Sequence, residues 1–209
     1  MANVSAPFGF AQYQGGAGGA PTFSQTTRRI ASGNGTAIYT GDPVMPVITS
    51  ATGYITQAAA GTTVVAGIFA GCKYLSTSQK RTVWNNYWPG SDATGDVEAY
   101  VIDDPNARFR VQGASTTFNI TGTLSTWTSS PVGQYAQFAI GTGNTANGLS
   151  GAYLNTLGTT ITYPFIVTDL ITAPPGANGA DPTTAYNQVV VGWNNEVWRS
   201  NGAGPTGIS

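Results

Sequence analysis

The chain is divided into many short apolar runs, and glycine, proline and asparagine residues separate one run from the next. Clear runs cover residues 64–71, 96–102, 161–170 and 188–193. None of them continues with the 3.6-residue apolar period that a long helix needs. Short apolar runs bounded by turn residues are typical of β-strands. We therefore predict an all-β fold, either a small β-barrel or a β-sandwich.

The strongest strand pattern lies in the middle of the chain. Residues 96–102 form the clearest predicted strand, and the turn sequence Asp-Asp-Pro-Asn follows at 103–106. In 108–112, two apolar residues alternate with Arg108, Arg110 and Gln112, which is the period of a half-buried strand. Two strands joined by a tight turn predict a hairpin.

Composition divides the chain into two regions. Residues 1–40 form a glycine-rich N-terminal arm, and residues 41–209 form the β-barrel or β-sandwich domain with loop-rich insertions. Within that domain, the strand pattern of 41–112 predicts a compact barrel, whereas 114–160 is rich in threonine, serine, glycine and asparagine and is expected to be an insertion. We also predict a loop-rich excursion at 73–95 and one helical turn at 150–154, with Ser150 as its cap.

The arm carries aromatic side chains between its glycines, namely Phe8, Phe10, Tyr13 and Phe23. Glycine loses much conformational entropy on ordering, so the arm is not expected to form a regular element alone. Its aromatic side chains nevertheless favour burial. We expect the arm to order against another surface, which is either its own domain or a neighbouring subunit.

The charge of the chain is nearly balanced. Eight lysine and arginine residues oppose nine aspartate and glutamate residues among 209, which gives a net charge of −1. A neutral surface exerts no long-range attraction on nucleic acid or on an anionic membrane. It suits permanent packing against other protein, where an unpaired buried charge is costly. We find no signal-peptide pattern and no membrane-length apolar stretch, so we expect synthesis in the cytoplasm.

The residue types that common catalytic sites require are missing. Histidine is absent, which excludes Ser-His-Asp and Cys-His arrangements and histidine metal sites. The single cysteine, Cys72, excludes an intrachain disulfide and is expected to be a buried apolar residue. Asp103 and Asp104 fit a structural turn better than a catalytic pair, and 92–98 lacks the alternating ligands of a known calcium loop. We therefore predict a non-enzymatic protein without a cofactor.

Three blocks of the sequence share a cadence of turns and short apolar segments. The blocks are Gly41-Asp42-Pro43-Val44 with 53–58, 60–62 and 67–71, then 101–106 with 109–112, and finally 141–146 and 148–151 with 189–195. Together they resemble head-decoration proteins, also called cement proteins, of tailed bacteriophages. The resemblance implies a virion structural protein on the outside of the capsid, with the major capsid protein as its partner and with trimers at local threefold axes. It carries over no catalytic residue.

Aromatic and basic residues are the candidate contacts with the shell or with other subunits. The basic pairs Arg28-Arg29 and Lys80-Arg81 are either solvated or in contact with acidic patches on a partner shell. The contact candidates are Phe8, Phe10, Tyr13, Phe23, Arg28, Arg29, Trp84 and Trp88.

A tail-associated or glycan-binding virion surface protein is the alternative, because exposed tryptophan can bind sugars. Tryptophan in a β protein of this size more often belongs to a core or an interface. The absence of a fibrous repeat and of a coiled-coil segment argues against a fibre. The candidates for sugar binding are Trp84, Trp88, Trp127, Trp193 and Trp198.

Overall fold

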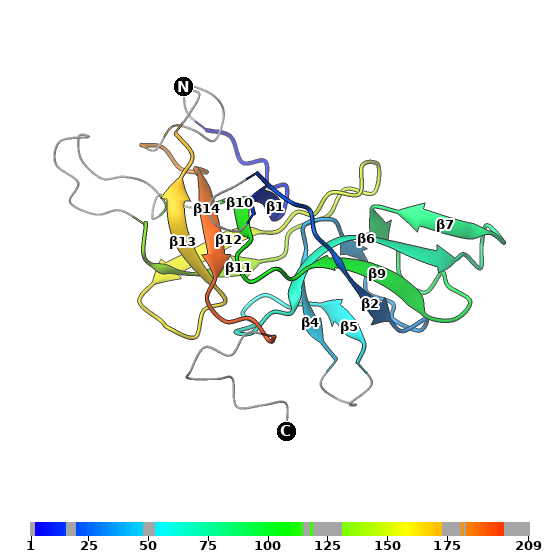
Figure 1. The fold of residues 1–209 in the computed structure, drawn as a ribbon. Coiled ribbons are helices and arrows are strands. Elements are labelled where there is room, and N and C mark those ends of the chain that lie inside the picture. Colours follow the sequence, from blue (N-terminus) through cyan, green and yellow to red (C-terminus); the bar gives the residue numbers. More distant parts are fainter. Residues whose placement is uncertain are drawn as a thin grey trace.

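The computed structural model describes residues 3–15, 20–47, 53–114, 118, 131–172, 181 and 183–198, and strands dominate this part of the chain (Figure 1). The prediction of an all-β fold is confirmed. The described strands form two large antiparallel sheets, which we call sheet A and sheet B, and one small sheet.

Sheet A collects six strands from distant parts of the sequence. Its order is β1 (Ala11–Gln14), β10 (Arg108–Gln112), β14 (Gln188–Trp193), β13 (Phe165–Leu170), β11 (Tyr135–Ala139) and β12 (Tyr153–Gly158). β14 contains three consecutive valines that are all buried, which fits its place between β10 and β13.

Sheet B also has six strands, and its longest strand organises the rest. Nine-residue β6 pairs with β9 along one side, and with β4 and then β7 along the other. The small sheet joins β3 (Ile38–Tyr39) to β8 (Tyr87–Trp88). The order of sheet B is β2 (Thr26–Ile30), β9 (Val97–Ile102), β6 (Gly67–Leu75), β4 (Pro43–Pro46) and β5 (Ile55–Gln57), with β7 (Thr82–Asn85) beside β6.

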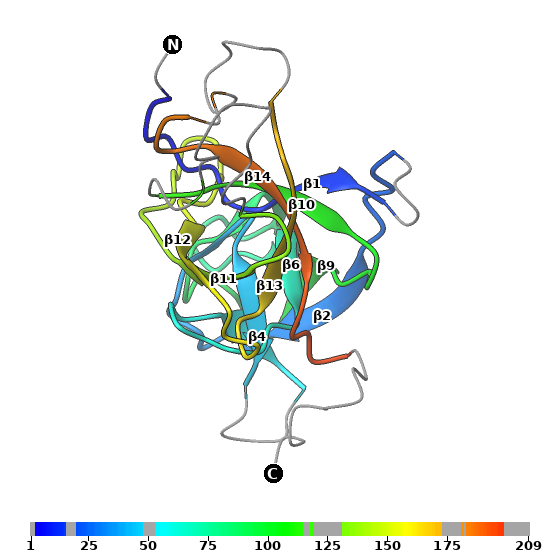
Figure 2. The same cartoon turned by 90° about the vertical axis from the view of Figure 1, so that its left-hand side faces the viewer.

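The two large sheets lie at opposite ends of an elongated molecule (Figure 1), and their strands overlap when the molecule is seen from one end (Figure 2). Each sheet curls so that strands that are distant in its order approach each other. One parallel bridge joins Arg29 to Tyr54 across sheet B, and another joins Gly113, just after β10, to Leu154 of β12. Neither sheet closes, so the closed barrel predicted for 41–112 is not formed, and a sandwich-like fold is consistent with the open sheets.

Aromatic side chains fill two buried clusters, of which the one behind sheet A also includes Ile68 and Ile102 of sheet B. In sheet A, the rings of Phe10 and Phe165 stack with centroids 4.5 Å apart, and Trp193 stacks on Phe165 at 5.6 Å. In sheet B, fully buried Trp88 meets the ring of Tyr74 edge-on at 5.1 Å. Burying a large apolar side chain stabilises a fold by about 1.5–3 kcal/mol.

The turn at 103–106 carries the chain from sheet B to sheet A. β9 pairs with β2 and β6, whereas β10 pairs with β1 and β14, so the predicted hairpin is wrong although both strands form. The carbonyl oxygen of Asp104 accepts the indole N–H of Trp193 at 2.8 Å and the backbone N–H of Ala107 at 3.0 Å. These bonds tie the crossover to the core of sheet A.

Several segments that looked irregular in the sequence contribute strands. Residues 1–40 supply β1, β2 and β3, so this N-terminal segment orders against its own domain. Residues 114–160 supply β11 and β12, which extend sheet A beside β13. The loop predicted at 73–95 instead contains the end of β6, then β7 and β8. The helical turn predicted at 150–154 is wrong, because β12 begins there at Tyr153.

Asp42 lies at a buried junction between the two sheets and is only 1% exposed. Its carboxylate accepts hydrogen bonds from the Ser150 hydroxyl at 2.5 Å, the Gln57 amide at 2.7 Å and the Tyr39 backbone N–H at 2.8 Å. The Ser150 oxygen in turn accepts the backbone N–H of Ala152, just before β12. Next to this junction, Gly41 has a φ of +95°, and a Cβ there would lie 3.0 Å from the Phe10 nitrogen, so only glycine fits.

The titration of Asp42 gives a testable pH dependence. Burial raises the pKa of Asp42 above its ordinary value, although the hydrogen bonds from Ser150, Tyr39 and Gln57 lower it. A carboxyl group whose pKa is raised by folding stabilises the fold below its unfolded pKa, and this contribution is lost as the pH rises through the folded pKa. As the pH rises from about 4 towards neutral, we expect the free energy of unfolding of the wild type to fall relative to that of Asp42→Asn.

Urea unfolding followed by tryptophan fluorescence at several pH values measures this difference. If the free energy of unfolding of the wild type rises with pH relative to that of Asp42→Asn, the expectation is contradicted. Asp42→Ala measures what the hydrogen bonds contribute, because it leaves three buried donors without an acceptor. We expect the free energy of unfolding to fall by about 1–3 kcal/mol for each donor.

Candidate functional site

A row of four polar and aromatic side chains crosses the solvent side of sheet B. Trp84 of β7 lies opposite Lys73 of β6, Lys73 lies opposite Glu98 of β9, and Glu98 lies opposite Arg29 of β2. Directly opposite residues in an antiparallel pair share one face of the sheet. The neighbouring residues of β6, Cys72 and Tyr74, point to the buried side, so strand alternation places the whole row on the solvent side.

The side chains of this row contact one another. The Lys73 ammonium lies 5.3 Å from the centre of the Trp84 ring and 3.9 Å from a carboxylate oxygen of Glu98. The Tyr100 hydroxyl, two residues along β9, donates to Glu98 at 3.1 Å. Burial first, and then this hydrogen bond, raise the pKa of Tyr100, so its hydroxyl stays protonated and remains a donor. Lys73 and Glu98 are therefore each held by neighbouring side chains of the row, so these charged groups are already positioned before any partner binds.

The row and its neighbours form what we call the outer face. Trp84 is 67% exposed, and Leu75, two residues along β6 from Lys73, is 45% exposed. At the far side, Arg29 lies 3.8 Å from Asp96, so basic and acidic groups are balanced across the surface. Large exposed apolar side chains that are rimmed by polar residues are typical of protein contact surfaces. The outer face consists of Leu75, Lys73, Trp84, Glu98, Tyr100, Arg29 and Asp96.

Only two of the eight contact candidates, Trp84 and Arg29, belong to the outer face. Phe10 and Trp88 lie in the two cores, at 2% and 0% exposed, so the described fold does not present their side chains to a partner. Arg28 turns towards its own chain, where it forms an ion pair with Asp103 at 2.7 Å and stacks on Trp198 at 4.3 Å.

The other aromatic candidates from the arm gather near β1, away from the outer face. Phe8 lies under the guanidinium of Arg110 at 5.0 Å. Tyr13 and Phe23 are 42% and 58% exposed, and the Phe23 backbone N–H donates to the side chain of Gln12. Of the sugar-binding candidates, Trp193 is buried in the core of sheet A, and Trp127 lies outside the described residues.

Sequence reasoning missed Lys73, Leu75, Glu98 and Tyr100. Residues 73–95 were expected to be a loop, which hid the end of β6 and its pairing with β7. The available signal was the alternation of Cys72 and Tyr74 with Lys73 and Leu75, a two-residue period that continues the preceding strand.

Two groups that could carry catalytic or metal-binding chemistry, Cys72 and Asp92, have structural surroundings. Cys72 is buried as predicted, and burial raises the pKa of its thiol to about 12, so it stays protonated at neutral pH. Both carboxylate oxygens of Asp92 accept hydrogen bonds from the loop between β6 and β7. The described residues hold no cluster of three or more histidine, cysteine or acidic side chains that suits a metal ion.

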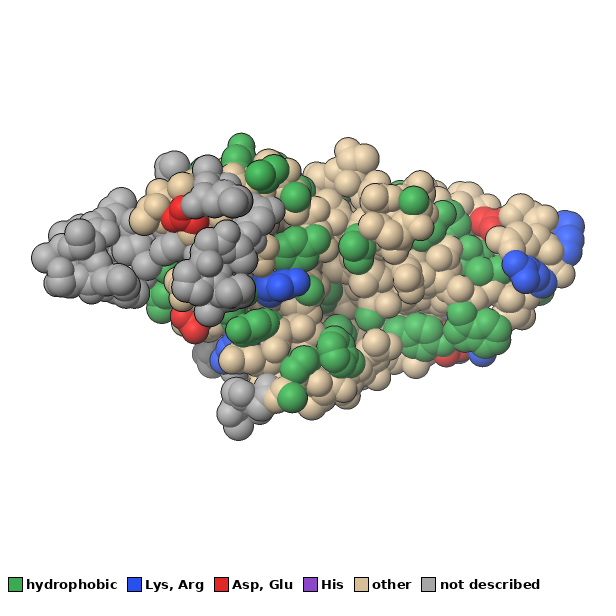
Figure 3. All heavy atoms as spheres, turned by 90° about the horizontal axis from the view of Figure 1, so that it is seen from above, with side chains coloured by type: hydrophobic (Ala, Val, Ile, Leu, Met, Phe, Trp, Pro, Cys, Tyr) green, Lys and Arg blue, Asp and Glu red, His purple; other side chains and the backbone are tan. Residues whose placement is uncertain are grey.

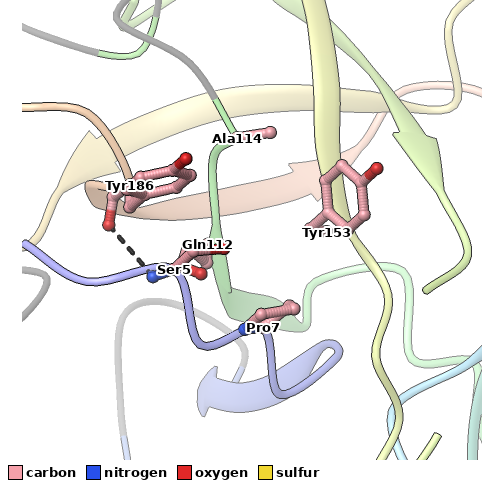
Figure 4. A pocket seen from close by; sticks show the side chains of 6 residues that line it. All are labelled: Ser5, Pro7, Gln112, Ala114, Tyr153 and Tyr186. Carbon is pink, nitrogen blue, oxygen red and sulfur yellow. Dashed lines mark hydrogen bonds between the residues drawn. The ribbon is translucent and has the colours of Figure 1, made fainter. Parts of the chain in front are cut away.

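A pocket of about 280 Å³ lies beside the N-terminal residues. Figure 4 shows Tyr153 and Tyr186 on opposite sides of it, and none of its six lining residues is charged. The side chain of Gln112 holds the N-terminal segment here: its amide nitrogen donates to the carbonyls of Val4 and Tyr186, and its oxygen accepts the N–H of Ala6. No lining residue is a charged base that could activate the hydroxyl groups of Ser5, Tyr153 or Tyr186. Its lining residues are Ser5, Pro7, Gln112, Ala114, Tyr153 and Tyr186.

The three hydrogen bonds of Gln112 predict a local effect on the N-terminal segment. In Gln112→Ala, we expect the Ala6 amide to exchange with solvent faster and the free energy of unfolding to fall by about 1–3 kcal/mol. Hydrogen exchange and urea unfolding measure the two effects. Gln79→Ala, at an exposed loop, is the matched control and should change stability by less than about 0.5 kcal/mol. Unchanged exchange at Ala6 would show that the segment is held by other contacts.

The contrast between Trp84 and Trp88 predicts opposite stability effects for the same substitution. Trp88→Ala opens a cavity in the core of sheet B and should cost about 3–5 kcal/mol. Trp84→Ala removes a largely exposed side chain and should cost less than about 1 kcal/mol. Thermal or urea unfolding of the two variants checks this, and equal losses would contradict the assignment of Trp84 to the surface.

No helix within the described residues has the length and apolar character needed to cross a lipid bilayer. Searches against family models, curated proteins and solved structures give no match to this chain.

Proposed function

We propose that this protein is a non-enzymatic decoration protein of a tailed-bacteriophage head, which binds major capsid subunits from outside and stabilises their contacts. The observation that carries the proposal is the outer face, where Trp84 is exposed on four hydrogen-bonded strands among balanced charges. The resemblance of the sequence blocks to head-decoration proteins supports the same role.

The chemistry of the outer face suits contact with a large protein surface. Tryptophan, tyrosine and arginine dominate the binding energy of protein interfaces, and Trp84, Tyr100 and Arg29 supply one of each. Their backbones are fixed in a sheet, so little conformational entropy is lost on binding. A gain of about 2 kcal/mol per copy, repeated over the many equivalent sites of a shell, would stabilise the particle strongly. We expect the copies to sit as trimers at local threefold axes of the virion surface.

A glycan-binding virion protein is the second candidate, and the observation in its favour is the exposed ring of Trp84. An exposed indole ring can stack on the apolar face of a sugar, and the nearby Glu98 carboxylate can accept hydrogen bonds from its hydroxyl groups. The protein contact is preferred because Glu98 is already engaged by Lys73 and Tyr100, which lowers its capacity for sugar hydroxyls.

Co-sedimentation with expanded, undecorated heads of the encoding phage tests the proposal. We expect saturable binding near one trimer per local threefold axis and a higher melting temperature of the heads. Trp84→Ala should weaken binding by about tenfold or more. Ile161→Ala is the matched control, because Ile161 is 69% exposed in the loop before β13 and lies outside the outer face; it should change binding by less than about twofold.

Two results would overturn the proposal. One is recovery of the protein in tail fractions with no binding to heads. The other is retention on an immobilised sugar that Trp84→Ala abolishes while binding to heads is unaffected, which would support the glycan-binding alternative.

A further inference from the structure

The loop that joins β6 to β7, residues 76–81, is a rigid tip. Within it, the Ser76 N–H donates to the Arg81 carbonyl at 2.9 Å, and the Lys80 N–H donates to the Ser76 carbonyl at 3.0 Å. Asp92, in the loop between β8 and β9, holds the tip, since its carboxylate accepts the Ser76 hydroxyl at 2.7 Å and the Ser78 N–H at 2.9 Å. These hydrogen bonds lower the pKa of Asp92, so the contact persists across the neutral pH range.

The tip presents two adjacent cations to solvent. Lys80 and Arg81 are both exposed, and neither forms an ion pair with any residue that the structure describes. The Gln79 side chain accepts two hydrogen bonds from the Arg81 guanidinium, at 2.9 and 3.0 Å, and so orients this group. Viewed from above, basic side chains gather at this end of the molecule, with apolar side chains behind them (Figure 3).

We propose that this tip, which we call the cationic tip, binds a carboxylate-rich protein surface. An oriented guanidinium matches the geometry of a carboxylate, and a lysine beside it adds a second charge. Because the tip extends from the same hairpin that carries Trp84, the inference deepens the proposed function: the acidic surface belongs to the shell subunit that the outer face contacts.

The charges around the tip favour protein over nucleic acid as the partner. Asp92 lies against the tip, and Glu98 and Asp96 lie on the adjoining outer face. A continuous line of phosphates would be repelled by these carboxylates, whereas a protein surface can place its own carboxylates against Lys80 and Arg81 alone. The net charge of −1 for the whole chain adds no general attraction to polyanions.

The first test uses the isolated protein and does not require shells. NMR of labelled protein follows the backbone amides of Lys80 and Arg81 during titration with a short poly-glutamate peptide, and in parallel with a DNA oligonucleotide of equal charge. We expect saturable shifts at the tip with the peptide. The double variant Lys80→Asn/Arg81→Gln should bind the peptide about fivefold more weakly. Asparagine is chosen because Lys80 has a φ of +56°, which asparagine tolerates.

Arg110→Gln is the matched control, because it removes one exposed positive charge from sheet A, and it should change binding by less than about twofold. Shifts spread evenly over all basic residues, or tighter binding of the oligonucleotide, would overturn the proposal.

A second test separates this proposal from the decoration function. Binding to heads is measured at low and at physiological salt for the wild type and the double variant. We expect the wild type to lose affinity as salt rises and the double variant to lose less. If the wild type binds heads and the variant shows the same salt dependence, the cationic tip is refuted while decoration stands. If the tip binds poly-glutamate but the protein ignores heads, decoration is refuted and the tip's preference for carboxylates stands.

Discussion

The carboxylate of Asp42 is the interaction on which the relative placement of the two sheets depends. It receives donors from β3 at Tyr39, from β5 at Gln57 and from the segment before β12 at Ser150. Burying a carboxylate is costly, and three donors offset much of that cost. A side chain without two acceptor oxygens would leave buried donors unsatisfied, so the identity of residue 42 is tightly constrained by the fold.

The outer face follows from this placement and from the length of β6. Sheet B could not present a four-strand surface if β6 ended after its pairing with β4, because β7 pairs only with the second half of β6. The same extension carries the cationic tip away from the body of the molecule. Strand alternation then divides the hairpin between a core that holds Trp88 and Tyr74 and a surface that holds Trp84 and Lys73.

Local patterns of apolar and polar residues were sufficient to predict many strands, but they did not predict which distant strands pair. The alternation at 108–112 identified β10, yet its partners β1 and β14 lie about a hundred and eighty residues apart in the chain, and no local pattern specifies such contacts. Gln112 illustrates the limit: its polar side chain predicted an exposed position, and it is buried because it binds the N-terminal backbone. Trp84 was identified as a contact candidate from its residue type alone, whereas Lys73 and Glu98 became visible only through cross-strand register.

The crossover at 103–106 has a mechanical consequence. β9 and β10 are consecutive strands in different sheets, so a force applied at the outer face passes along β9 and through this turn into the centre of sheet A. There β10 lies between β1 and β14, and a pull along its axis loads the hydrogen bonds of both ladders together in shear. The Trp193 indole bonded to the Asp104 carbonyl braces the turn itself. Part of a load between the two sheets is therefore carried by the short turn at 103–106, beside the polar contact of Asp42 with Ser150.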